Sequence, residues 1–244
     1  MKASSFALAA VLALLAATSG AARAGELVVI ASTDSEFGVG SVLDGRQAIQ
    51  VADGQSVTLV SSDGRTLKLR GPYSGRPDPA PDAGGAAGAG GSALLDALAD
   101  IVKPTAQDVS TAGIMRSSLY APKQPWVIDS GQSGAHCVLP GRPALLWRPI
   151  AIGAASAALK ADADPSGGPA GVTWQDGSYT APWPAGLPFA DGATYQLEFT
   201  VTGKTRRLSI HQVPGDLDSD VSRAVWMHAK GCTAQAKALL GTLS

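Results

Sequence analysis

Asp-Gly pairs recur along this chain between short runs of aliphatic and β-branched residues, and they restrict the possible fold more than any other feature. They lie at residues 44–45, 53–54, 63–64, 176–177 and 191–192, and a Thr-Gly pair follows at 202–203. Gly readily adopts the positive φ that tight hairpin turns require, so such pairs favour short antiparallel strands. The sequence therefore predicts a mainly β fold.

Residues 25–75 are expected to form a small antiparallel sheet. Its predicted strands cover residues 27–32, 39–43, 47–51, 56–61 and 65–71. Val57 and Leu59 flank the polar Thr58, and this alternation predicts one apolar face and one solvent-exposed face. About 50 residues bury little surface alone, so this sheet should pack against the rest of the chain.

The next segment, residues 76–91, is a Pro-rich and then Gly/Ala-rich tract that is predicted to be a linker. Its glycines do not match a phosphate-binding loop, because no strand precedes them and Gly91 stands where the Lys is needed. Residues 92–125 are expected to hold a helix and an irregular connection. Ser92 is the predicted N-cap of that helix, and Lys103-Pro104 should end it.

The second half is predicted to be a β-sandwich-like domain over residues 126–215, followed by a C-terminal helical hairpin over residues 216–244. Its expected strands are 126–129, 137–139, 144–147, 155–161, 171–174, 195–201 and 204–211. All five Trp lie after residue 125, so the main aromatic core is expected here. In the hairpin, Asp218 or Ser219 should cap the first helix, and Gly231 should end it.

Residues 1–24 have the three regions of a secretory signal peptide. Lys2 provides the positive charge, residues 6–17 are an unbroken apolar run, and Ala22-Arg23-Ala24 gives the small-x-small cleavage pattern. The run is shorter than the ~20 residues of a membrane span. We expect a cleaved leader, a periplasmic or secreted protein of a Gram-negative bacterium, and no stable membrane insertion afterwards.

Export gives the two cysteines a default partner in each other. In an oxidising compartment an even number of Cys favours disulfides, so Cys137 is predicted to pair with Cys232. Closing this loop would remove about 4–5 kcal/mol of unfolded-chain entropy in the simple model.

Composition and spacing exclude several functions. The chain has 19 Lys and Arg against 20 Asp and Glu without a basic run, whereas nucleic-acid binding needs clustered cations. Two Cys and three His cannot supply a Cys-rich zinc module, and Asp216, Asp218 and Asp220 lack the Gly and Glu of a calcium loop. We expect no nucleic-acid partner, no metal and no cofactor.

A hydrolase is the enzymatic alternative, because Asp129, Ser133 and His136 crowd into one stretch. The stretch lacks the Gly-x-Ser-x-Gly pattern of a nucleophile elbow, and closeness in sequence is not triad geometry. We therefore expect no enzymatic activity.

Two groups of residues are candidates for binding. Trp126, Trp174 and Trp183 could form a stacking platform for carbohydrate or cell wall, although large aromatic side chains more often pack in cores. Arg206 and Arg207 are part of the densest positive cluster, which could meet an acidic partner or be a solvated face.

Residues 38–75 carry a Gly-Ser-Val start, a Val-x-Asp-Gly-Gln-Ser-Val-x-Leu centre, an Asp-Gly-Arg turn and a Leu-x-Gly-Pro end. This block resembles the FecR-type periplasmic domain of proteobacterial envelope proteins. Residues 125–129, 145–149 and 226–240 look like a region of exported proteins that carry this domain. The resemblance implies a non-catalytic β module in envelope signalling or surface assemblies. We expect a binding or signalling accessory that contacts an envelope protein, with a carbohydrate-binding module as the alternative.

Overall fold

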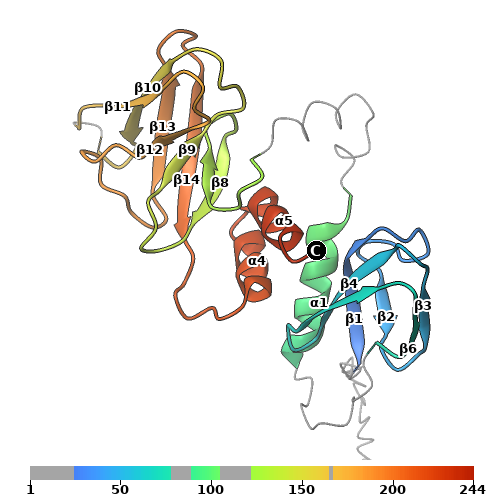
Figure 1. The fold of residues 1–244 in the computed structure, drawn as a ribbon. Coiled ribbons are helices and arrows are strands. Elements are labelled where there is room, and N and C mark those ends of the chain that lie inside the picture. Colours follow the sequence, from blue (N-terminus) through green and yellow to red (C-terminus); the bar gives the residue numbers. More distant parts are fainter. Residues whose placement is uncertain (1–24, 78–88, 105–121, 165–166) are drawn as a thin grey trace, which may run out of the picture.

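The computed structural model describes residues 25–77, 89–104, 122–164 and 167–244, and it shows two β-rich parts with helices between them (Figure 1). The mainly β prediction is confirmed. The predicted leader at residues 1–24 lies outside the described residues. So do residues 78–88 of the predicted linker and residues 105–121 of the expected irregular connection.

The N-terminal part contains a four-stranded antiparallel sheet in the order β2-β1-β4-β5 and a separate pair of strands, β3 and β6. The strands are β1 (Glu26–Ser32), β2 (Val42–Asp44), β3 (Ile49–Val51), β4 (Ser56–Ser61), β5 (Thr66–Arg70) and β6 (Tyr73–Gly75). The predicted antiparallel sheet is confirmed. Strand β6 was not expected, because only two residues separate it from β5.

The prediction of a solvent-exposed face is wrong for β4. Val57 and Leu59 are buried in the core of the N-terminal sheet, and Thr58 on the opposite face is only 2% exposed. The opposite face is covered by α1 (Ala89–Val102), whose Leu98 belongs to the same hydrophobic cluster as Val60. A polar residue within a strand therefore did not mark a face that meets water, because a distant helix covers it.

Helix α1 begins at Ala89, so the predicted boundary between the linker and a helix capped by Ser92 is wrong by three residues. Two glycines are thereby included in the first turn, where each costs about 1 kcal/mol relative to Ala. Gly91 is buried, and Leu95 further along packs into the cluster shared with β1. Tertiary packing of the helix thus overrides its weak intrinsic propensity at this end.

The Asp-Gly pairs are turns, but most do not close hairpins. Gly64 and Gly203 have positive φ and join strands that pair with each other. Gly54, Gly177 and Gly192 also have positive φ, yet they connect strands of different sheets. Gly45 does not have positive φ, so the expectation was wrong there.

The C-terminal part is a sandwich of two mixed sheets, ordered β11-β10-β13-β14-β8 and β12-β9-β7. Its strands are β7 (Val127–Asp129), β8 (Gly134–Val138), β9 (Leu145–Trp147), β10 (Ala155–Ala161), β11 (Ala170–Trp174), β12 (Thr180–Pro182), β13 (Thr194–Phe199) and β14 (Thr205–Gln212). Strand β8 runs parallel to β14 and forms an edge of the five-stranded sheet. Side chains of both sheets, including Trp174 and Leu146, fill the core.

Two helices, α4 (Asp220–Ala229) and α5 (Thr233–Gly241), form the predicted C-terminal hairpin. The Ser219 side chain accepts a hydrogen bond from the Ser222 N–H and caps α4, and Gly231 has φ +84° between the helices. One hydrophobic cluster joins both helices to α1, to β1 and to the start of the sandwich. The helices therefore connect the two β-rich parts (Figure 1).

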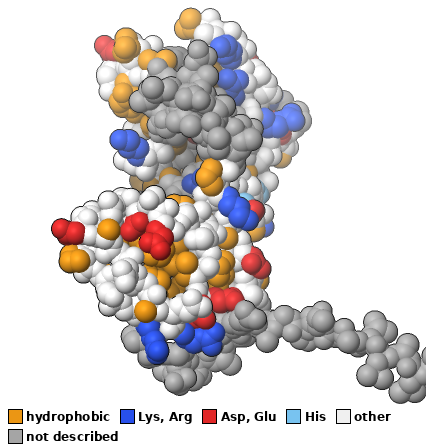
Figure 2. Space-filling model, turned by 90° about the vertical axis from the view of Figure 1, so that its right-hand side faces the viewer, with side chains coloured by type: hydrophobic (Ala, Val, Ile, Leu, Met, Phe, Trp, Pro, Cys, Tyr) orange, Lys and Arg blue, Asp and Glu red, His pale blue; other side chains and the backbone are white. Residues whose placement is uncertain are grey.

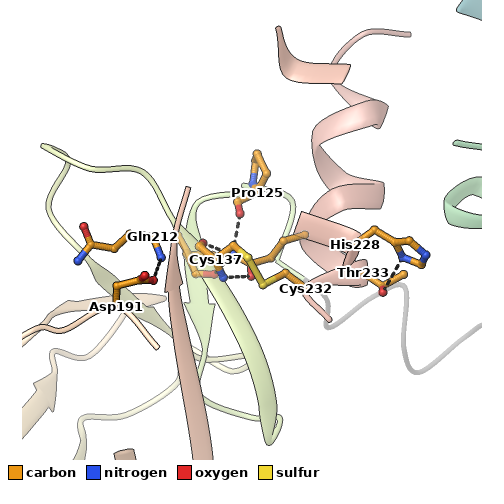
Figure 3. The surroundings of a disulfide bond; sticks show 9 residues. Pro125, Cys137, Asp191, Gln212, His228, Cys232 and Thr233 are labelled. Carbon is orange, nitrogen blue, oxygen red and sulfur yellow. Dashed lines mark hydrogen bonds between the residues drawn. A yellow bond between two sulfur atoms is a disulfide. The ribbon is translucent and has the colours of Figure 1, made fainter. Parts of the chain in front are cut away.

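The predicted Cys137–Cys232 disulfide is present, with the two Cα atoms 5.9 Å apart. It joins β8 to the residue that precedes α5, as Figure 3 shows. Disulfides are typical of proteins outside the reducing cytosol.

Beside the disulfide, the buried side chain of Gln235 completes the edge of β8. Its Oε1 accepts a hydrogen bond from the Cys137 N–H at 2.7 Å, and its Nε2 lies 2.8 Å from the Cys137 carbonyl oxygen. Nε2 also lies 2.8 Å from the carbonyl oxygen of Pro125 and 3.1 Å from that of Val127. The carboxamide therefore takes the place of a peptide group of a neighbouring strand.

Gln235→Leu should destabilise the protein strongly. The change removes little volume but leaves the buried N–H of Cys137 and at least one carbonyl without a partner, at about 1–3 kcal/mol for each group. We expect the free energy of unfolding, measured in urea with the disulfide intact, to fall by about 2 kcal/mol or more. Gln196→Leu, at an exposed position of β13, is the control. Equal losses in the two variants would contradict this role of Gln235.

Candidate functional site

A cavity of about 380 Å³ runs beside the edge of β8, between the segment 129–136 and α5. Its walls include the polar side chains of Asp129, Gln132 and Ser133 and the small side chains of Ala135 and Ala238. It therefore contains the stretch that the sequence offered as a hydrolase candidate.

Backbone groups of β8 face this cavity. The Val138 carbonyl accepts a hydrogen bond from the Val213 N–H, so Val138 is directed toward β14. Hydrogen-bonding groups alternate along a strand, and those of Cys137 meet Gln235 on the opposite side. The N–H and carbonyl of Ala135 must therefore also point away from β14, beside the cavity that Ala135 lines. Among the described residues, no hydrogen bond occupies the backbone groups of Ala135 on this side.

His136 is a buried, neutral imidazole in the wall of the cavity. It is 5% exposed, and one ring nitrogen bonds the backbone of Gln132 while Nε2 has no partner among the described residues. Burial lowers the pKa of His136 to about 4. A base with so low a pKa is poorly matched to general-base catalysis near neutral pH.

The neighbouring Asp and Ser are occupied elsewhere. The Asp129 carboxylate accepts a hydrogen bond from the Gly131 N–H at 2.8 Å, and burial raises its pKa. The Ser133 Oγ accepts from the Arg207 N–H at 3.1 Å. Within the described part of the chain, no hydrogen bond links Ser133 to His136 or His136 to Asp129. The three side chains therefore do not form the relay that a catalytic triad requires.

The Trp residues do not form a shared platform. Trp174 is fully buried and donates from Nε1 to the Leu146 carbonyl at 2.9 Å, so its prediction as a binding residue is wrong. Its position on the inner face of β11, opposite β9, explains this. Trp183 is half-buried and packs edge-to-face on Phe189 and Tyr195. Half-buried Trp126 instead packs against the helical cluster.

Arg206 and Arg207 do not form one basic surface. They are consecutive in β14, so their side chains point to opposite faces of the sheet. The Arg206 Nε donates to the Gly131 carbonyl at 2.8 Å, and the Arg207 Nε lies 3.3 Å from an Asp162 carboxylate oxygen. Each arginine therefore has its own local partner.

Arg148 organises the loops at one end of the sandwich and was not identified from the sequence. This buried side chain donates to the carbonyls of Ser178, Ala151, Gly153 and Gln175, at 2.8–3.0 Å. The loops it holds present exposed Ile152, with 90% of its surface accessible. The sequence signal for the role of Arg148 was its position as a lone Arg directly after a short apolar strand and before a Gly-containing loop.

On the face shown in Figure 2, charged side chains of both signs are spread over the molecule, and acidic ones lie next to a hydrophobic patch in the N-terminal part. A cavity of about 430 Å³ in that part is lined by Asp34, Glu36 and Asp53. Among the described residues, no group of three or more His, Cys, Asp or Glu side chains is arranged to hold a metal ion.

The helices of the described segments are all too short or too polar to cross a membrane. Comparison with protein-family models, with curated proteins and with solved structures finds no match.

The burial of His136 should make the free energy of unfolding depend on pH. The pKa is 6.5 in a model peptide and about 4 in the folded protein, so between these values only the unfolded chain binds the proton. The free energy of unfolding should therefore fall by about 3 kcal/mol as the pH drops from 7 to 4.

His136→Gln should remove this part of the pH dependence in urea titrations at pH 4 to 7, whereas His211→Gln on neighbouring β14 should retain it. Asp129 acts in the opposite sense, because its raised pKa makes the folded state bind a proton more readily. The difference between variant and parent therefore isolates the contribution of His136. Parallel curves for parent and His136→Gln would contradict the assignment.

Proposed function

We propose that this protein is an exported, non-enzymatic binding accessory of the bacterial cell envelope that holds an extended segment of a protein partner along the edge of β8. The observation that carries the proposal is the divided edge of β8. Gln235 occupies the backbone groups of Cys137, whereas those of Ala135 face the cavity. An extended peptide adds to such an edge through main-chain hydrogen bonds.

The cavity offers room for the side chains of such a segment. Gly134, Ala135, Gly231, Ala234 and Ala238 line it with small groups along β8 and α5. Alternate side chains of an added strand would point toward these residues, and pockets for alternate side chains give this mode of recognition its specificity. Gln235 would limit the register, because a partner strand cannot also pair with Cys137.

The envelope location rests on separate observations. The predicted leader and the resemblance of residues 38–75 to FecR-type periplasmic domains both favour export, and the Cys137–Cys232 disulfide suits an oxidising compartment. Periplasmic binding or signalling through protein contacts is consistent with all three.

Filling the cavity should weaken peptide binding. Linear peptides selected from a phage-displayed library against the purified protein serve as the probe, and Ala238→Trp places an indole in their path. We expect this variant to bind them about tenfold more weakly or worse, since a blocked hot-spot pocket costs at least about 1–2 kcal/mol. Ala229→Trp, at the exposed end of α4, should bind them normally.

Amide hydrogen exchange gives a second readout of the same complex. A bound peptide should protect the Ala135 amide, because that N–H would donate to the added strand. Protection confined to other regions, or equal binding by Ala238→Trp and Ala229→Trp, would reject the proposed site.

A further inference from the structure

Two adjoining cavities lie on either side of the loop that connects β8 to β9. Their volumes are about 520 Å³ and 240 Å³, and both are lined by Val138, Leu139 and Arg142. The two cavities thus share a wall formed by these three residues, and together they are called the groove below.

Apolar side chains form both ends of this groove. Trp126 and Leu145 line the larger cavity, and Trp183 and Phe189 line the smaller one. The aromatic wall of the smaller cavity is fixed in place, because Trp183 lies edge-to-face with Phe189 and Tyr195, at centroid distances of 5.0 and 4.8 Å. Its indole N–H also donates to the Leu187 carbonyl at 3.1 Å. Such a surface is ready to receive an apolar group without rearrangement.

The charged group in the lining is a cation. Arg142 is exposed and forms no ion pair or side-chain hydrogen bond with the described residues, and none of the described residues that line either cavity is acidic. The amides of Gln124 and Gln212 supply further polar groups at the two ends. The groove thus combines apolar walls with one uncompensated positive charge, which is complementary to a ligand with one negative charge.

We propose that this groove binds a small amphiphilic monoanion. Its aromatic or acyl body would lie against the Trp126 or Trp183 wall, and its carboxylate or sulfonate would meet the guanidinium of Arg142. The groove shares Gln124 with the β8 cavity, but the proposal does not depend on the binding of a protein partner there.

The probe is 1-anilinonaphthalene-8-sulfonate, and N-phenyl-1-naphthylamine is its neutral counterpart. Arg142→Gln should weaken binding of the sulfonate about tenfold or more and leave the neutral amine unaffected, because a hydrogen bond to a charged group contributes about 1.5–3 kcal/mol. Arg142→Lys should retain part of the preference for the sulfonate over the neutral amine. Arg70→Gln, an exposed arginine of β5, should change neither affinity.

Further variants locate the bound probe. Trp126→Phe should reduce energy transfer from tryptophan to the probe, whereas Ile152→Ser at the exposed loop and Ala238→Trp at the β8 cavity should not affect binding. Competition by decanoate or by 2-naphthoate then distinguishes an acyl from an aromatic body. The proposal is overturned if Arg142→Gln binds the sulfonate like the parent protein, or if Ile152→Ser abolishes the binding.

Discussion

The carboxamide of Gln235 is the contact on which the arrangement of helices and sandwich depends. It meets backbone groups of β8 and of the segment that leads into β7, while the adjacent disulfide ties the start of α5 to the same strand. Helix α5 packs with α1 in one cluster, and α1 covers β1 and β4 of the N-terminal sheet. The N-terminal sheet is thus attached to the sandwich through the helices that Gln235 anchors.

The same contact shapes the proposed binding edge. An edge strand with free peptide groups along its whole length can pair with many chains and is a risk for aggregation. Here a side chain closes the edge at Cys137 and α5 borders the remainder, so only a short stretch around Ala135 stays accessible. A small open edge favours a specific partner segment over unrestricted sheet growth.

Features that depend on neighbouring residues could be predicted from the sequence. The strands at 56–61 and 155–161, the Ser219 cap and the disulfide follow from alternation, capping chemistry and cysteine count. The burial of Thr58 could not be predicted, because it results from α1 packing across the sheet. Gln235 also gave little local signal, since only the fold places its amide against β8. For the candidate site, the sequence gathered Asp129, Ser133 and His136 but could not show how their hydrogen bonds are directed.

Arg148 holds its loops through their carbonyl oxygens, and every residue type has a carbonyl oxygen. The exposed side chains of Ile150, Ile152 and Tyr179 take no part in these hydrogen bonds. Over evolutionary time this end of the sandwich could exchange its outward-facing residues while keeping its backbone path. The hydrogen bonds of Arg148 would be kept when these outward-facing side chains change.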